Sequence, residues 1–186
     1  GRSSGIVIPT YGDSRALGFF LRNGGFYWGI NDNLDARITG DIYSLGSWGS
    51  ALTTRYRKRY KYNGNVNISY TKRKEGFEEL ASYSEVNNMF VRWNHSQDSK
   101  ARPGSRFSAN VNLGSSSNFR NNLNSFSNDY LTNTFQSSVT YTNSFPNKPF
   151  NLTMSARHSQ NTQSEQFNIN LPDVSFNVSR QFPFKS

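Results

Sequence analysis

Apolar and small polar side chains alternate along this chain with a period of two residues. The pattern is clearest at 107–113, where the sequence reads FSANVNL, and it returns at 66–70, 150–156 and 167–171. Successive residues of a β-strand point to opposite faces of the sheet, so each of these segments has one apolar and one polar face. A chain built almost entirely of such strands must place its apolar faces against a second sheet or against lipid.

The composition is compatible with both arrangements. Hydrophobic residues make up 34% of the 186 residues, whereas soluble domains usually contain about 45–50% with glycine included. Aromatic residues nevertheless reach 15%. Low hydropathy with many aromatics is typical of a membrane β-barrel, in which only alternate residues contact lipid. It is also compatible with a polar β-sandwich of one domain.

The formal charge of +9 indicates an anionic neighbour, either nucleic acid or phosphorylated lipid. The densest basic run covers 55–61 and has arginine at 55, 57 and 59; tyrosines stand at 56 and 60 and, directly after the run, at 62. In a strand these arginines and tyrosines occupy opposite faces. A nucleic-acid platform would interleave them, so the segregation favours a wall with two different sides and no nucleic-acid partner.

We predict nine antiparallel strands joined largely by hairpins. They cover 17–30, 35–43, 49–60, 65–72, 89–97, 106–113, 134–143, 150–158 and 166–179. Asn63-Gly64 is the strongest hairpin signal. Longer polar connections cover 73–86 and 115–131, and the second could hold a short helical turn. Strands of this length exceed the five or six residues usual in soluble sandwiches and suit a tilted membrane crossing.

The last predicted strand contains a change of phase. Its apolar positions are 167, 169 and 171, then 174, 176 and 178. One extra residue at Pro172-Asp173 restores the alternation, which indicates a β-bulge inside a single strand. A hairpin at this point is the alternative.

Nothing in the sequence indicates catalysis or a bound metal or cofactor. The chain has no cysteine, and its two histidines, His95 and His158, lie on separate predicted strands, whereas a zinc site needs three or four convergent ligands. The carboxylates form no positioned acid–base pair beside a nucleophile. The chain also lacks a long apolar run and an initiator methionine, and we expect a processed product or a piece of a longer protein.

Several stretches taken in order resemble the LptD family of outer-membrane lipopolysaccharide-assembly proteins. They are 4–9 (SGIVIP) followed by Tyr11-Gly12, 26–36 (FYWGINDNLDA), 56–57, 92–96 (RWNHS) and the connection at 119–135. The resemblance implies a partial transmembrane β-barrel of outer-membrane type, with these nine strands as the first part of a much larger barrel. Residues 1–14 would lead in from the periplasmic side, and 15–186 would be the N-terminal section of the barrel domain.

The resemblance also implies a function and partners. Lipopolysaccharide would arrive from periplasmic Lpt bridge proteins and pass into the outer membrane through a lateral gate beside the first strands, with an LptE-like lipoprotein plug inside the barrel. The partners would thus be lipopolysaccharide, the plug, the bridge and outer-membrane lipids. Two alternatives stay open at this point: a soluble basic β-sandwich that binds a polyanion, and another outer-membrane barrel such as a porin or adhesin.

The gate is expected to be a weak seam. In the family the first two strands carry prolines, which remove donors from the hydrogen-bond ladder. In this chain glycines stand at the positions taken as equivalent to those prolines. A glycine has no side chain that could pack against its neighbours. Bulges that serve barrel curvature are the alternative role. The expected gate residues are Phe19, Leu21, Gly24, Gly25, Tyr27, Gly29 and Gly40.

The two faces of the strands give the remaining site residues. Arginines opposite the apolar face are expected to line the lumen and contact phosphorylated sugar or the plug, with simple solvation of the lumen wall as the alternative. These are Arg37, Arg55, Arg57, Arg59 and Arg92. The expected lipid-facing residues are Val66, Ile68, Met89, Val91, Trp93, Phe107, Val111, Leu152 and Met154.

Overall fold

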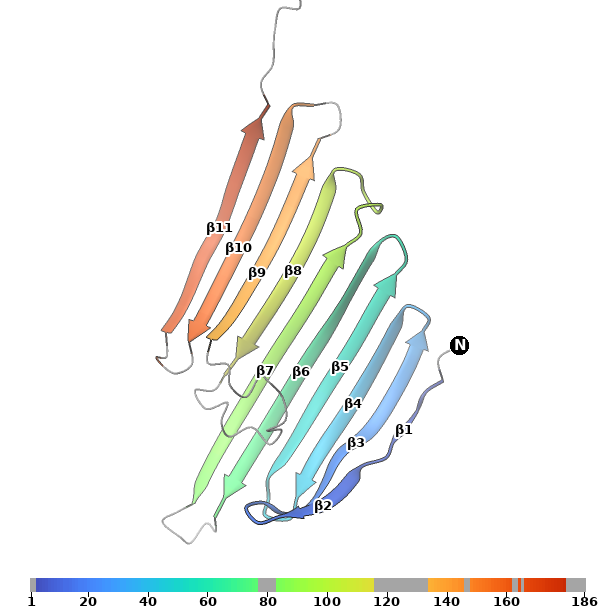
Figure 1. Ribbon diagram of the computed structural model, residues 1–186, viewed down its shortest axis with the longest axis vertical. Coiled ribbons are helices and arrows are strands. Elements are labelled where there is room, and N and C mark those ends of the chain that lie inside the picture. Colours follow the sequence, from blue (N-terminus) through green and yellow to red (C-terminus); the bar gives the residue numbers. More distant parts are fainter. Residues whose placement is uncertain are drawn as a thin grey trace, which may run out of the picture.

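The computed structural model is one antiparallel sheet of eleven strands (Figure 1). It describes residues 3–76, 83–115, 134–145, 148–161, 164 and 166–179, except for the side chain of Leu171. The strands are β1 (Gly5–Val7), β2 (Thr10–Ser14), β3 (Gly18–Asn31), β4 (Leu34–Tyr43), β5 (Trp48–Lys58), β6 (Tyr62–Glu75), β7 (Ser84–Gln97), β8 (Ser105–Gly114), β9 (Thr134–Ser144), β10 (Phe150–Asn161) and β11 (Gln166–Val178). Within these ranges no helix is long and apolar enough to cross a membrane.

The strands follow one another across the sheet in chain order from β3 to β11. The short strands β1 and β2 both pair with β3 and together occupy one edge. Strand β11 forms the other edge, and the described sheet does not close on itself (Figure 1). Every neighbouring pair is antiparallel, as hairpin connections require.

All nine predicted strands are present, but the predicted number of strands is wrong. Residues 5–7 and 10–14, which we expected to lead in ahead of the first strand, are already part of the sheet. The signal was missed because Pro9, which cannot donate to a ladder, divides this strand into two pieces too short to show an alternation. The connection expected at 73–86 is too long, because β6 extends to Glu75 and β7 begins at Ser84. Residues 77–82 of this connection, and 116–131 of the one expected at 115–131, lie outside the described residues.

The predicted hairpin turn at Asn63-Gly64 is also wrong. Both residues lie inside β6, and the turn is formed earlier, at 59–61, where Tyr60 has a positive φ of 58°. Gly64 has a different role: a Cβ at this position would lie 2.3 Å from Cζ and Oη of Tyr56 on the neighbouring strand. The glycine therefore makes room for a tyrosine ring.

The register separates the sheet into an apolar face and a polar face. Directly paired residues share a face, and a row on the apolar face runs across seven strands through Ile6, Phe26, Ile38, Leu52, Ile68, Val91 and Leu113. A row on the polar face runs through Asp35, Arg55, Asn65, Asn94, Asn110, Ser138, Arg157 and Asn170. The predicted alternation is thus carried from strand to strand without loss of phase.

The apolar face has no second layer of described residues against it. Large side chains on it are open to the surroundings, with Ile38 57% and Ile42 61% exposed, and only Leu17, Tyr43, Ala109 and Phe135 are buried hydrophobic residues in the described part. The two-layer sandwich that we kept as an alternative is therefore not the fold of this region. A sandwich would bury its apolar side chains together in one core. No such common core joins Phe107, Val111, Leu152 and Ile169.

The predicted bulge in the last strand is confirmed. Strand β11 is continuous, and its register against β10 shifts by one residue between the pairs Ser155–Asp173 and Arg157–Asn170. The extra residue falls at 171–172, beside Pro172. The hairpin alternative at this point is therefore wrong.

A compact group of side chains secures the end of the sheet near the β2–β3 and β4–β5 turns. Leu17 and Tyr43 are buried with Phe20 packed against them, and Arg22 Nε donates to Tyr43 Oη over 2.7 Å. The Arg22 guanidinium also lies 4.1 Å from the centre of the Phe20 ring. Hydrogen bonding and cation–π attraction thus hold the edge hairpin to β4.

Ser47 joins the β4–β5 turn to β6. The side chain is fully buried, and its Oγ donates to the carbonyl of Lys74 over 3.1 Å and accepts from the Lys74 N–H over 2.8 Å.

We expect Ser47→Ala to lower the free energy of unfolding by about 1–3 kcal/mol, because two backbone groups lose their partner. Urea titration of the full-length protein in detergent measures this. Ser50→Ala, at an exposed position of β5, is the control and should change little; equal losses would contradict the role of Ser47.

Candidate functional site

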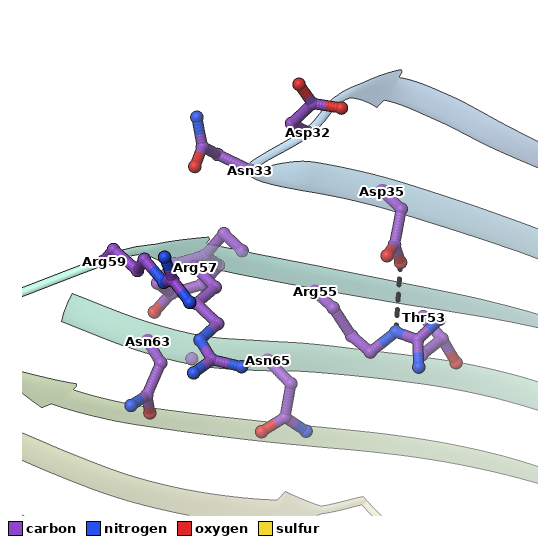
Figure 2. Close-up of a pocket in the computed structure, with 11 residues that line it drawn as sticks. Asp32, Asn33, Asp35, Thr53, Arg55, Arg57, Arg59, Asn63 and Asn65 are labelled. Carbon is purple, nitrogen blue, oxygen red and sulfur yellow. Dashed lines mark hydrogen bonds and ion pairs between the residues drawn. The ribbon is translucent and has the colours of Figure 1, made fainter. Parts of the chain in front are cut away.

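A concavity of about 680 Å³ lies on the polar face between the β3–β4 and β5–β6 turns (Figure 2). Its lining is Asp32, Asn33, Asp35, Thr53, Arg55, Tyr56, Arg57, Arg59, Asn63, Gly64 and Asn65. We call it the arginine pocket. The register explains its composition, because Arg55 pairs with Asn65 and Arg57 with Asn63, which brings guanidinium and amide groups to one face.

One of the three arginines is held by a carboxylate. The Asp35 side chain is only 2% exposed, and its Oδ1 accepts from Arg55 Nε over 3.0 Å. Arg55 itself is 64% exposed. Asp35 and Arg55 are direct partners in the β4–β5 register, so the ion pair crosses the ladder and fixes the side chain of Arg55 on the pocket wall.

The other two arginines point elsewhere in the pocket. Figure 2 shows the side chain of Arg57 extending toward Asn63 and Asn65, while that of Arg55 turns toward Asp35. The backbone N–H of Arg57 donates to the carbonyl of Asn33 over 2.7 Å, which ties the end of β5 to the β3–β4 turn. Neither Arg57 nor Arg59 forms an ion pair with any residue of the described segments.

This arrangement suits an anion. Guanidinium groups bind phosphate or carboxylate oxygens through paired N–H donors, and asparagine amides add neutral donors at the same site. The described residues contain no group of three or more histidines, cysteines or carboxylates that could hold a metal ion. The guanidinium and amide donors that line the pocket suit negatively charged oxygen groups.

The predicted lumen arginines share one face but not one pocket. Arg37 and Arg92 lie in a single row of the polar face, with Thr53 and Asn67 between them. Arg37 is exposed, whereas Arg92 Nε donates to Asn112 Oδ1 over 3.0 Å. Arg59 is in the β5–β6 turn rather than on a strand. The register places the four strand positions on one face of the sheet, while contact with sugar or plug stays a prediction.

The predicted gate residues are not on the edge strand. Gly40 lies on β4, and the others lie on β3, which is paired on one side with β1 and β2 and on the other with β4. Phe19 and Leu21 belong to the apolar face, as does Gly24, whereas Tyr27 pairs with Arg37 on the polar face. Gly25 and Gly29 share the face of Tyr27. The edge of the described sheet on this side is therefore formed by β1 and β2, and the opposite edge by β11.

The ladder around β3 is interrupted at one level on both of its sides. Toward the edge, pairing stops at Val7–Gly25 and resumes at Thr10–Arg22, and Pro9 stands in this gap. Toward β4, the register shifts by one residue between Leu21 and Gly24. Asn23 has a φ of 57°, and its N–H donates to Asp41 Oδ1 over 2.7 Å instead of to a strand. This level is a weak point of the sheet.

Sequence reasoning expected a weak seam or a bulge at Gly24, Gly25 and Gly40, and the register shift lies directly beside the Gly24–Gly40 pair. It missed Asp35 and the place of Asn23 in this bulge, although each leaves a signal. The apolar positions of β3 change phase between Leu21 and Phe26, in the same way as those of the last strand. The change indicates a bulge, and Asn23, which tolerates a positive φ, lies inside it. Asp35 stands in phase with Arg37, but only the register with β5 reveals Arg55 as its partner.

The predicted lipid-facing residues all belong to the apolar face. Ile68 pairs with Val91 and Trp93 pairs with both Val66 and Val111. Met89, opposite Tyr70, continues the same face, and Phe107 leads to Met154 through Tyr141. Leu152 is two positions from Met154 and shares its face. These residues thus share one face of the sheet, while their contact with lipid stays a prediction.

Fold and pocket together define an all-β protein whose sheet has one polar face, which carries the arginine pocket, and one apolar face. A family model described as LptD protein matches residues 1–186. The chain therefore belongs to the LptD family, a family of transport and assembly proteins with a role in lipopolysaccharide transport at the bacterial outer membrane. A comparison with curated proteins gives no match. Membership of this family excludes the porin and the adhesin, which the sequence alone had left as alternatives.

The Asp35–Arg55 pair gives an asymmetric prediction. Arg55→Ala leaves a buried carboxylate without its guanidinium partner and should cost about 1–3 kcal/mol of unfolding free energy. Asp35→Ala leaves Arg55 with access to solvent, since most of that side chain is exposed, and should cost less. Urea titration of both variants of the full-length protein compares them. A larger loss for Asp35→Ala would contradict this account of the pair.

Proposed function

We propose that this chain forms the first strands of an LptD barrel wall and one side of its lateral gate. The apolar face contacts outer-membrane lipid, and the polar face lines the lumen. The observation that carries the proposal is the unbroken separation of the two faces across the sheet, with no second layer of described residues on the apolar side. A membrane barrel needs this separation, because hydrocarbon lies on one side of its wall and water on the other.

The edge formed by β1 and β2 is the proposed gate strand. Backbone groups in a bilayer must find partners within the protein, so a wall opens most easily where its ladder is already incomplete. Pro9 removes one donor from this edge, and the bulge at Asn23 weakens the next pairing inward. On this proposal the barrel section begins at Gly5 rather than after residue 14, and only the residues before it lead in from the periplasmic side.

The arginine pocket is the proposed contact for phosphorylated sugar on the lumen side. Lipopolysaccharide carries phosphate groups, and Arg57 and Arg59 offer guanidinium donors beside the amides of Asn63 and Asn65. An LptE-like plug would meet other parts of the polar face, and periplasmic Lpt bridge proteins would deliver the lipopolysaccharide. Transport of this kind needs binding and release but no covalent chemistry.

The pocket proposal is tested by removing two charges. We expect Arg57→Ala combined with Arg59→Ala to lower photo-crosslinking of lipopolysaccharide to this part of the wall and to reduce its level on the cell surface. The reason is the loss of charge-assisted hydrogen bonds to phosphate. Arg37→Ala, an exposed arginine of the same face outside the pocket, is the matched control. Normal lipopolysaccharide export by the double variant would contradict the proposal and would indicate that these arginines only solvate the lumen wall.

The gate proposal is tested by hydrogen exchange of the assembled full-length barrel. Amides of 5–14 and of Gly24 and Gly25 should exchange at least about tenfold faster than those of β5 and β6, because an incomplete ladder opens locally. Pro9→Ala restores a donor and should slow exchange on the edge strand. Strong protection at Gly24 and Gly25 in the unaltered protein would reject a weak seam here.

A further inference from the structure

Three neighbouring turns at one end of the sheet carry exposed basic side chains. They join β5 to β6, β7 to β8 and β9 to β10, and they lie at the end where β1 begins (Figure 1). We call this group the basic rim and define it by five exposed residues: Lys58, Lys61, Lys100, Arg102 and Lys148. Arg59 of the first turn belongs to the arginine pocket and is not part of the rim.

The rim charges are not neutralised by the chain around them. None of the five rim residues forms an ion pair with another described residue. Asp98 is the one carboxylate in these turns, and its Oδ1 accepts from the backbone N–H of Lys100 over 2.9 Å. The Lys100 ammonium lies 5.3 Å from the centre of the exposed Tyr60 ring, so the first two turns contact each other. The rim is therefore a connected positive surface.

At the opposite end of β6 and β7 the basic side chains have carboxylate partners. Lys72 Nζ is 2.7 Å and Lys74 Nζ 3.9 Å from the Glu85 carboxylate, and Arg73 forms an ion pair with Glu75. These ion pairs have no counterpart among the described residues of the rim. The same pair of strands thus ends in balanced charge on one side and in unbalanced positive charge on the other.

The lengths of the connections favour the periplasmic side for the rim. Outer-membrane barrels have short periplasmic turns and longer extracellular loops. The rim turns cover 59–61, 98–104 and 145–149, whereas the two longest connections, 76–83 and 115–133, belong to the other end of the sheet. Strand β1 also begins at the rim end, and the proposed function brings the chain to this strand from the periplasm.

The shape of the rim suits a flat anionic surface rather than one small ligand. Its turns follow one another at every second strand, so the charges extend over ~19 Å along the wall at about 4.8 Å per strand. Lys58 belongs to the apolar face itself, two positions beyond Tyr56 and opposite Tyr62. The rim therefore lies where the apolar face ends, and its long side chains can reach a charged layer while their stems stay on apolar surface.

We propose that the basic rim selects phospholipids with anionic headgroups in the periplasmic leaflet of the outer membrane. Lysine and arginine at a membrane surface attract lipids of net negative charge, and salt screens this attraction. The inference rests on the proposed function, since it requires the apolar face to lie in a bilayer. It adds a preference for headgroup charge, which contact between acyl chains and apolar side chains does not provide.

The test captures lipid at the centre of the rim in the full-length protein, reconstituted into phosphatidylcholine vesicles that contain a minority of phosphatidylglycerol. Tyr60→p-benzoylphenylalanine keeps an exposed ring beside Lys100, and ultraviolet light links it to neighbouring lipid. Per molecule present, phosphatidylglycerol should be captured at least about threefold more than phosphatidylcholine at low salt. At about 1 M salt, where the Debye length is about 3 Å, the preference should disappear. Equal capture of the two lipids at low salt would overturn the proposal.

Removal of the rim charges tests the assignment to these residues. Lys58→Gln, Lys61→Gln and Lys100→Gln together should abolish most of the preference for phosphatidylglycerol, because glutamine keeps a polar side chain without the charge. Lys72→Gln with Lys74→Gln, at the opposite end of β6, is the matched control and should leave the preference unchanged. An equal loss in both variants, or no loss in the triple variant, would overturn the assignment. If the triple variant does not assemble, the salt dependence with the unaltered rim still decides the proposal.

A second capture position separates this inference from the proposed function. Ile38→p-benzoylphenylalanine, at an exposed position of the apolar face away from the rim, should capture both phospholipids equally. Capture at Ile38 without a headgroup preference at Tyr60 would overturn the inference alone. No lipid capture at Ile38 would overturn the proposed function and the inference with it. In cells, capture of lipopolysaccharide at Tyr60 in place of phospholipid would overturn the assigned lipid.

Discussion

The hydrogen-bond register between neighbouring strands is the constraint on which this structure depends. A side chain's face is fixed by its parity, so a slip of one residue between two strands would exchange the polar and apolar faces of everything that follows. The described strands keep phase from β4 to β10. The arginine pocket is a consequence of that register, because it is assembled from residues paired across β5 and β6.

The same register explains why so few side chains are buried. A sheet that separates two different environments needs no internal core, and its stability comes from the ladder and from what covers each face. Local clusters appear only where the sheet needs support, as at Leu17 and Tyr43 beside the edge hairpin and at Ser47 between β4 and β6. Elsewhere large apolar residues such as Ile38 are exposed within the chain, which is the condition that membership of an outer-membrane family explains.

Much of this fold could be predicted from the sequence, because a period of two in side-chain polarity is a direct image of a two-faced strand. The nine long strands and the bulge at Pro172 follow from it. The edge strand could not be predicted in this way, since Pro9 divides it into β1 and β2, which are too short to show a period. The Asn63-Gly64 signal failed because the glycine serves the Tyr56 ring. The site was predictable as a set of arginines on one face, but the Asp35–Arg55 pair and the separation of Arg37 from the pocket depend on which residues stand opposite each other.

The two halves of the edge strand share one alignment with β3, and this has a mechanical consequence. In every pair of β1 and of β2 the two residue numbers have the same sum, from Gly5–Tyr27 to Ser14–Gly18. The interruption at Pro9 therefore removes bonds without adding or deleting a residue. If either β1 or β2 separates from β3, the other strand stays paired and keeps the alignment. The separated residues can then pair again only with their original partners on β3. An edge strand aligned in this way can re-form its hydrogen bonds with β3 only in the original register.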